Sequence, residues 1–236
     1  MLSILRHLED VGFENAPKVV GSGFSRDGRE CVTYVPGETP HEPFAWHPDA
    51  AYGLGQLVRR VHESLSTWTP PHLAVYRPWF ARELPGSSPV IGHCDAGPYN
   101  ILADGGSPIA LIDWEFAGPT DAVWELTHVV WMNAQLHKTA FSDPHLPLPD
   151  PSDRAVVAKA ILDGYEWPSR LREVFVDDLI EYVIRSAAAK GAPRSGRSDA
   201  AESPRRSADL QRDVMWRARG ANWILDNRPY LERTLR

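Results

Sequence analysis

The order of hydrophobic and polar residues predicts a short mixed front piece followed by a mostly helical body. Apolar side chains at helical spacing from Leu2 to Val11 indicate an opening amphipathic helix, and Gly12 ends it. A second apolar stripe predicts a helix that Asp49 caps and that runs to Leu65. The same spacing recurs later in the chain and predicts helices near residues 122–136, 153–165, 169–190 and 208–235.

Two short strands are expected between the first two helices. Residues 18–20 and 30–35 have the composition of strands, and the Arg-Asp-Gly sequence at residues 26–28 supplies the turn between them. The Pro-Gly pair at residues 36–37 ends the second strand. Two longer stretches are rich in proline or in Gly, Ser, Pro and Arg, and we expect them to be loops: residues 66–89 and 191–207.

The composition narrows the classes of function. The 236 residues carry a net charge of -6, which is the opposite of the basic surface that nucleic-acid binding requires. No stretch approaches the roughly 20 consecutive apolar residues of a membrane span, and the start of the chain becomes charged at Arg6, which makes a poor signal peptide. Cys31 and Cys94 lie in apolar, strand-like surroundings, which favours a reducing cytoplasm over a disulfide framework. We therefore expect a cytoplasmic protein that binds neither nucleic acid nor membrane.

The pattern that carries chemistry lies in residues 93–115, HCDAGPYNILADGGSPIALIDWE. Two apolar runs flank the turn-forming sequence Asp-Gly-Gly-Ser at residues 104–107, so this segment predicts a β-hairpin. Folding the hairpin about its middle pairs residue 100 with about residue 111, which brings Asn100 and Asp113 to its open end. Asp95 precedes Asn100 by five residues, in the loop that leads into the first leg. We therefore expect three oxygen-bearing side chains to converge.

Such a group of oxygen atoms suits a divalent cation and a base. Mg²⁺ prefers carboxylate and amide oxygens together with water and substrate phosphates, so an Asp and an Asn leave room for a nucleotide. A second Asp that does not bind metal can accept a proton from an attacking hydroxyl group. Phosphoryl transfer requires little beyond positioning and charge neutralisation. The pattern therefore favours phosphoryl transfer to a hydroxyl group.

The same residues resemble a known family. His-x-Asp, followed after four residues by Asn and then by Ile-Asp-Trp-Glu, is similar to the catalytic motif of the aminoglycoside phosphotransferase and choline kinase family, a branch of the protein-kinase fold. The resemblance covers about residues 2–135. It implies that His93 shapes the catalytic loop and that Asp95 is the base. It also implies that Asn100 and Asp113 bind Mg²⁺, while ATP or GTP donates its γ-phosphoryl group to a hydroxylated small molecule.

Two other segments fit this resemblance. Residues 34–38, Tyr-Val-Pro-Gly-Glu, are similar to the hinge that follows the last strand of the N-terminal lobe in the family. The resemblance implies that Thr33, Tyr34 and Val35 form the purine site, with backbone groups of Thr33 and Val35 meeting the base. The helical stretch that ends at His62 resembles a family helix whose histidine is usually structural.

The chain also departs from the family pattern. A complete small lobe has a Gly-rich turn and a strand Lys that contact the phosphates, and neither precedes the opening helix here. Either the natural start lies further upstream or the protein lacks this phosphate-binding element. A milder departure is Glu125-Leu126-Thr127, where the family has Asp-Leu-Ala with an Asp that braces the catalytic loop. The glutamate keeps the charge and adds one methylene group.

Some candidate residues have simpler explanations. Cys94 beside His93 suggests a thiol nucleophile, but neighbours in an extended segment point apart, so a buried structural thiol is favoured. Five acidic residues of the C-terminal helices suggest a site for a cationic substrate, but an ordinary polar helix face is the favoured interpretation: Asp163, Glu166, Asp177, Asp178 and Glu181.

We therefore predict a protein-kinase-like α+β fold in two parts. Residues 1–37 would form a truncated N-terminal lobe and hinge, made of a helix and a β-hairpin, and residues 38–236 a mostly helical catalytic lobe. The predicted function is that of a small-molecule kinase. The alternative is a pseudokinase-like module that binds a nucleotide or metabolite without catalysis, because the phosphate-binding element is missing. Metal-assisted phosphate hydrolysis would need no purine site, and the hinge-like segment argues against it.

Overall fold

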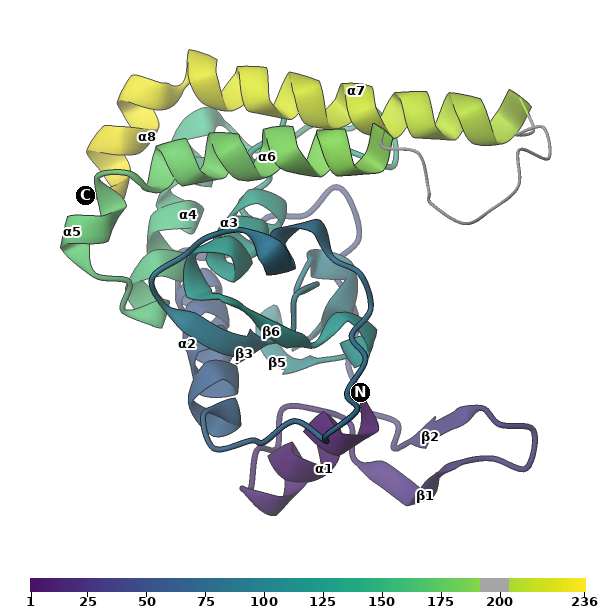
Figure 1. The fold of residues 1–236 in the computed structure, drawn as a ribbon. Helices are drawn as coiled ribbons and strands as arrows, with labels where there is room; N and C mark the ends of the chain where they lie inside the picture. The colour runs from purple at the N-terminus through teal and green to yellow at the C-terminus, as the bar shows by residue number, and fades with distance from the viewer. Residues whose placement is uncertain (192–203) are drawn as a thin grey trace.

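The computed structural model describes residues 1–191 and 204–236, so most of the loop predicted at residues 191–207 lies outside the described part of the chain. Within it, no helix is both long and apolar enough to cross a membrane. Each predicted helix forms, and each of the last two predicted segments is divided into two helices (Figure 1). The helices are α1 (Leu2–Asp10), α2 (Pro48–Leu65), α3 (Ala122–Asn133), α4 (Pro151–Tyr165), α5 (Ser169–Arg172), α6 (Phe175–Gly191), α7 (Pro204–Asp226) and α8 (Arg228–Leu235).

The strands of the described residues form three antiparallel pairs. Short 3-10 turns lie between some of them, at η1 (Phe80–Glu83), η2 (Pro98–Asn100) and η3 (Trp114–Phe116). The fold is α+β, as predicted. The pairs are β1 (Val19–Phe24) with β2 (Glu30–Val32), β3 (Pro89–Gly92) with β6 (Gly118–Asp121), and β4 (Ile101–Asp104) with β5 (Ser107–Leu111).

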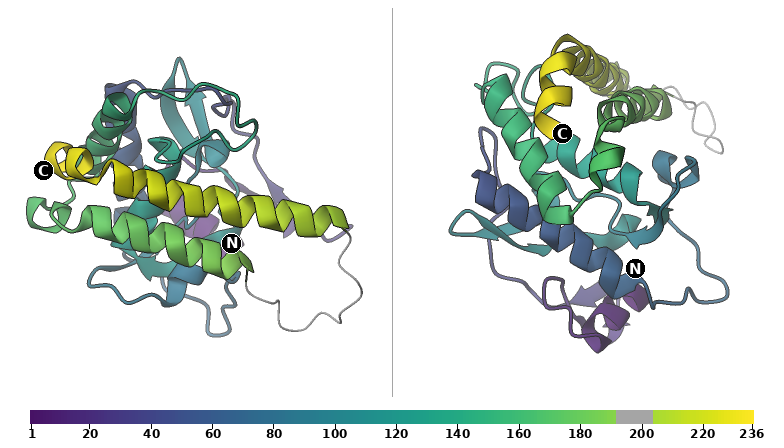
Figure 2. Two further views of the ribbon diagram at one scale, coloured as in Figure 1. Left: turned by 90° about the horizontal axis from the view of Figure 1, so that it is seen from above. Right: turned by 90° about the vertical axis from the view of Figure 1, so that its left-hand side faces the viewer.

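The elements are arranged with the candidate site in the middle of the molecule. α1 and the β1–β2 hairpin lie at one end, and α6 and α7 lie side by side at the opposite end (Figures 1 and 2). The β3–β6 pair, the β4–β5 hairpin and helices α2 to α4 lie between these two ends. One continuous cluster of buried apolar side chains runs from α1 to α8. The segment of residues 93–115 therefore packs against a core to which both ends of the molecule contribute.

The first two helices differ in detail from the prediction. Val11 lies beyond the end of α1 and is 47% exposed, so it does not extend the buried face of that helix. α2 begins at Pro48, and its N-cap is His47, whose imidazole Nδ1 accepts the backbone N–H of Asp49 at 3.3 Å. The prediction that Asp49 is the cap was wrong. Proline is favoured in the first turn of a helix, so α2 already begins at Pro48, one residue before Asp49.

Two glycines allow α2 and α4 to pack closely. A methyl group at Gly55 or at Gly164 would overlap a backbone carbonyl of the other helix. This close approach brings Tyr165, at the end of α4, against the last turn of α2, where its hydroxyl lies 2.8 Å from His62 Nδ1. The contact matters because His62 belongs to the polar network under the candidate active site.

Candidate active site

The β4–β5 hairpin forms as predicted and sets the positions of two candidate metal ligands. The Asn100 carbonyl accepts the N–H of Ile112 at 3.0 Å, so residue 100 lies opposite residue 112 rather than 111. An irregularity in the strand pairing between residues 102 and 103 accounts for this shift of one position. Asp113 follows directly on the second leg. Asn100 and Asp113 therefore both lie at the open end of the hairpin.

Asp95 lies in the loop between β3 and η2 and contacts Asn100 directly. The Asn100 side-chain amide donates to Asp95 Oδ2 at 3.0 Å and to the Asp95 backbone carbonyl at 2.9 Å. The Tyr99 hydroxyl donates to Asp95 Oδ1 at 2.8 Å. Burial raises the pKa of Asp95, while the hydrogen bond from Tyr99 opposes that rise. The amide nitrogen of Asn100 faces Asp95, which leaves the amide oxygen for another partner.

His93 connects this loop to the hairpin. Its Nε2 lies 2.9 Å from the Ile112 carbonyl, and its Nδ1 lies 3.3 Å from the backbone N–H of Asp95. Burial lowers the pKa of His93, so the imidazole is neutral at pH 7. In the neutral ring, Nε2–H donates to the carbonyl and Nδ1 accepts from the loop. His93 thus fixes the position of Asp95 relative to the second leg of the hairpin.

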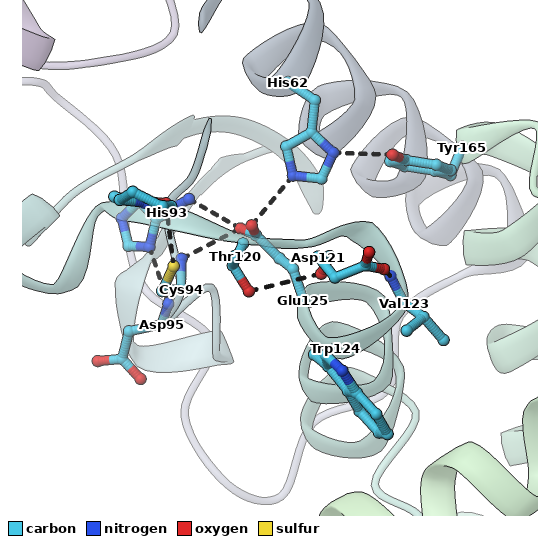
Figure 3. A network of polar contacts seen from close by, with 12 residues as sticks. His62, His93, Cys94, Asp95, Thr120, Asp121, Val123, Trp124, Glu125 and Tyr165 are labelled. Carbon is cyan, nitrogen blue, oxygen red and sulfur yellow. Dashed lines mark hydrogen bonds and ion pairs between the residues drawn. The ribbon is translucent and has the colours of Figure 1, made fainter. Parts of the chain in front are cut away.

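Glu125 on α3 braces the same loop from below (Figure 3). Its Oε1 accepts the backbone N–H groups of His93 at 2.9 Å and Cys94 at 3.1 Å, and its Oε2 lies 3.0 Å from His62 Nε2. Burial alone would raise the pKa of Glu125, but the charge and hydrogen bond of His62, with the loop donors, lower it overall. The extra methylene relative to the family's Asp therefore does not prevent the brace.

Gly92 explains how the longer side chain fits. It is the last residue of β3, and a Cβ atom there would overlap Oε2 of Glu125. The carboxylate therefore occupies the space that a side chain at position 92 would need. Gly92 and Glu125 therefore form a matched pair: the absence of a side chain at position 92 leaves the space that the long side chain of Glu125 fills.

This pairing predicts non-additive stability changes. Gly92→Ala should lower the free energy of unfolding by about 3 kcal/mol, because the methyl group displaces the buried carboxylate. Glu125→Asp should lower it by about 2 kcal/mol, because the shorter side chain withdraws from the loop N–H groups. The double variant should lose at least about 1 kcal/mol less than the sum. Urea denaturation of the four proteins tests this, and simple additivity would contradict the pairing.

Two residues of the site have left-handed backbone conformations. Cys94 has φ 65° and Asp113 has φ 60°. Aspartate tolerates this region. For a cysteine this backbone conformation is unfavourable by about 1–3 kcal/mol, and it persists only where the surroundings hold the residue in place. The hydrogen bond from the Cys94 N–H to Glu125 is such a restraint. The Cys94 thiol is buried and burial raises its pKa well above the usual value, which fits the predicted structural role.

Two residues near Asp95 were not singled out as site residues from the sequence. His128 lies one helical turn after Glu125, and its Nε2 is 3.6 Å from Asp95 Oδ1. Its Nδ1 is 2.9 Å from the hydroxyl of Tyr182 on α6. Burial lowers the pKa of His128 to about 4, so the ring is neutral at pH 7. The spacing of three residues between Glu125 and His128 puts both on one helix face, and that spacing is the signal that could have identified His128.

The hinge-like segment lies beside the β4–β5 hairpin. Glu38 and Ala103 exchange backbone hydrogen bonds of 3.1 and 2.8 Å, which attach the segment to β4. Thr33 is tied to the β1 side by its N–H, which donates to the Lys18 carbonyl at 2.8 Å. The side chain of Tyr34 is 86% exposed and contributes no buried contact. Residues 33–38 therefore run from the β1–β2 hairpin to β4 of the β4–β5 hairpin.

Comparison with known proteins agrees with this architecture. Residues 39–158 match the family model described as "Phosphotransferase enzyme family". The trifolitoxin immunity protein of Rhizobium leguminosarum bv. trifolii is 39% identical over 236 residues, which cover 100% of this chain and 87% of the relative. A match of this length places the whole chain, not only the motif, within one group of related proteins.

Solved structures of similar fold are small-molecule kinases. The amicoumacin kinase hAmiN, in complex with AMP-PNP, Ca2+ and Ami, has a TM-score of 0.63 and 15% identity, covering 94% of this chain and 76% of that chain. The choline kinase from Cryptosporidium parvum Iowa II has a TM-score of 0.57 and 11% identity, covering 98% and 77%. At such identities the likeness shows the fold alone. The chain therefore belongs to the phosphotransferase enzyme family, with the protein-kinase-like fold that the motif in residues 93–115 predicts.

Proposed function

We propose that this chain transfers the γ-phosphoryl group of ATP or GTP to a hydroxyl group of a small molecule. The observation that carries the proposal is the contact of Asp95 with Asn100 at the open end of a hairpin that also carries Asp113. Family membership supports phosphoryl transfer to a small molecule. We propose in addition which nucleotide is the donor, which residue is the base, which residues bind the metal and what kind of molecule is the acceptor.

Asp95 is the base in this proposal. Its carboxylate accepts the proton of the acceptor hydroxyl, the hydroxyl oxygen bonds to the γ-phosphorus, and the bond from that phosphorus to the β–γ bridging oxygen breaks. The loop is held by His93 and Glu125, so the carboxylate is fixed before the acceptor arrives. Because burial raises its pKa, Asp95 is a better proton acceptor than an exposed carboxylate.

Asn100 and Asp113 fit a magnesium site that forms together with the nucleotide. Asn100 offers an amide oxygen because its nitrogen is bound to Asp95, and Asp113 offers a carboxylate from the opposite leg. Two protein oxygen ligands suffice for Mg²⁺, which keeps water and phosphate oxygens around it. The cation supplies charge neutralisation of the β- and γ-phosphates when it is bound.

The purine site and the division of the chain follow from the same proposal. Thr33, Tyr34 and Val35 would meet the purine, chiefly through the backbone, because this segment runs beside the catalytic hairpin. Residues 1–37 would act as the N-terminal lobe and hinge, and residues 38–236 as the catalytic lobe. The free thiols of Cys31 and Cys94 fit a cytoplasmic location.

Thermal unfolding with nucleotide tests whether the site binds as proposed. Mg²⁺-ATP or Mg²⁺-GTP at about 100 times its dissociation constant should raise the melting temperature by roughly 5 °C or more. The nucleotide without Mg²⁺ should raise it much less. No shift at millimolar nucleotide would contradict the proposal. A shift without any phosphorylated product would favour the alternative, a pseudokinase-like binding module.

Immunity to a toxin is a second candidate function. The observation that favours it is the 39% identity to the trifolitoxin immunity protein over the full chain. Phosphorylation of a hydroxyl group on a toxin and simple binding of the toxin would both protect a cell. Expression of this chain and of its Asp95→Asn variant in a toxin-sensitive strain separates the two. If the variant no longer protects the strain, protection requires catalysis. If the variant still protects it, binding of the toxin is sufficient.

A further inference from the structure

Arg217 on α7 has an unusual environment for a guanidinium group. Its Nη1 donates to the Asp213 backbone carbonyl at 3.1 Å, and its Nε is buried with no hydrogen-bond partner among the described residues. No carboxylate of the described residues lies within ion-pair distance. The guanidinium lies over the indole rings of Trp131 and Trp216, at 5.9 and 5.7 Å. Burial lowers the pKa of Arg217, so the protein holds this charge at a cost.

Arg154 shows what a structural buried arginine looks like in the same molecule. Its Nε and Nη1 donate to three backbone carbonyls, those of Pro149, Gln135 and His137, at 2.6 to 3.1 Å. It also lies over an indole ring, that of Trp223. Arg154 therefore needs no further partner, whereas the Nε of Arg217 has no acceptor among residues 1–191 and 204–236.

Two more N–H groups without partners lie beside Arg217. The indole Nε1 of Trp131 and the imidazole Nε2 of His128 are both buried and have no hydrogen-bond partner in the described part of the chain. Tyr182 joins the group, because its ring packs against both Trp131 and His128. Its hydroxyl lies 2.9 Å from Nδ1 of His128; in the tautomer in which this hydroxyl donates to Nδ1, the ring proton of the neutral imidazole is on Nε2. Three nitrogen donors that lack partners among the described residues, on Arg217, Trp131 and His128, thus lie around Tyr182.

This donor cluster lies next to Asp95, on the side away from the β1–β2 hairpin. His128 Nε2 is 3.6 Å from Asp95 Oδ1. Burial and Asp95 raise the pKa of the Tyr99 hydroxyl that donates to the same carboxylate, and the charge of Arg217 is close enough to oppose that rise. α7 lies at the end of the molecule opposite to β1 and β2 (Figures 1 and 2). A nucleotide at residues 33–38 would therefore leave this side of Asp95 to the acceptor.

Most groups near the cluster that could hold a cationic acceptor already have a cation of the protein as partner. Aromatic rings that could hold a substrate ammonium already hold the guanidinium of Arg217. Of the five acidic residues noted in the C-terminal helices, four pair with cations of the protein: Asp163 with Lys159 and Arg172, Glu166 with Arg59, Asp177 with Arg228, and Glu181 with Arg185.

Asp178 is the acidic group that has no such pair among the described residues. It lies on α6 one turn before Tyr182, and burial together with Glu181, Asp177 and Asp121 raises its pKa to about 6. It is therefore the residue that would recognise a cationic acceptor if Arg217 did not set the specificity. A test must compare the two residues.

We propose that Arg217, with the N–H groups of Trp131 and His128, binds an anionic group of the acceptor. The acceptor would then be a hydroxylated carboxylate or phosphate ester rather than an amino alcohol. A guanidinium with free N–H groups matches both anions in geometry and charge. The identification of this anion as the acceptor rests on the proposed function, whereas binding of the anion does not.

The test follows the indole N–H resonance of Trp131 in ¹⁵N-labelled protein without nucleotide. Three probes of similar size are titrated: 3-hydroxypropionate, glycerol 3-phosphate and 3-aminopropanol. We expect a saturable shift with at least one of the two anions and none with the amino alcohol. The anion that binds more tightly identifies the group. Arg217→Gln should weaken that binding by roughly 10- to 100-fold, because a charge-assisted hydrogen bond is lost.

Matched variants separate this proposal from others. Arg219→Gln removes an exposed arginine from the same helix and should leave the titration unchanged. Asp95→Asn should keep or strengthen the anion-dependent shift, because it removes a negative charge 3.6 Å from His128 Nε2. A failure of phosphoryl transfer is therefore distinguishable from a failure of anion binding. Three results would overturn the proposal: no saturable shift with either anion, a shift that persists in Arg217→Gln, or binding of 3-aminopropanol that Asp178→Asn abolishes.

Discussion

Replacement of Asp95 by Asn is expected to lower kcat for phosphoryl transfer by roughly 10²- to 10⁴-fold. The asparagine keeps the size of the side chain and one of the two oxygens that accept from Tyr99 and Asn100, but it cannot accept the proton of the acceptor hydroxyl. Binding of Mg²⁺-nucleotide should stay within a few-fold of the natural protein. The measurement is steady-state turnover together with nucleotide titration of the same samples.

The pH dependence supplies a control for this prediction. In the natural protein kcat/KM should fall as the pH decreases through the pKa of Asp95, which burial raises above its ordinary value. The direction follows because the base must be ionised, and a raised pKa moves its protonation to higher pH. The residual rate of Asp95→Asn should lack this acid limb. Full turnover in the variant would rule out Asp95 as the base.

Replacement of Asp113 by Ala should abolish the Mg²⁺-dependent part of nucleotide binding and lower kcat/KM by at least about 100-fold. The reason is that the carboxylate opposite Asn100 is lost, and a catalytic metal contributes several kcal/mol of charge stabilisation. Calorimetric titration with a non-hydrolysable ATP analogue, with and without Mg²⁺, measures the effect. Equal affinity for the magnesium complex before and after the change would remove Asp113 from the metal site.

Asp113→Gly is the matched control for backbone strain. Residue 113 has φ 60°, which alanine adopts only with strain and glycine adopts freely. The glycine variant should lose Mg²⁺-dependent binding to the same extent as the alanine variant while unfolding at a higher temperature. A glycine variant that binds normally would show that strain, and not metal binding, explains the alanine result.

The hairpin and the motif could be predicted because both depend on local chemistry. The Gly-Gly turn and the flanking apolar runs predict the register of β4 and β5 to within one residue. The error of one residue comes from the irregular strand pairing between residues 102 and 103. The brace from Glu125 was uncertain from the sequence. Its geometry depends on the space left by the missing side chain of Gly92. Gly92 lies on β3 and Glu125 on α3, and no rule of sequence spacing relates these two positions.

The donor cluster on the acceptor side could not be predicted for the same kind of reason. Arg217, Tyr182 and His128 come from three helices, and their proximity depends on how α3, α6 and α7 pack. The charge of Arg217 is one among many in a polar helix, so nothing in the sequence marks it as lacking a partner. The acidic residues show the converse, because four of five that stand out in the sequence are paired with cations in the structure.

Formation of a phosphate ester tests the account most directly. The protein is incubated with Mg²⁺ and ATP or GTP and with a pool of hydroxylated small molecules, and ³¹P NMR follows the γ-phosphate. We predict a new phosphomonoester resonance with the natural protein, and its formation at least about 100-fold more slowly with Asp95→Asn at equal protein and nucleotide occupancy. Nucleotide binding without any ester, or ester formation at the same rate in the variant, would contradict the account.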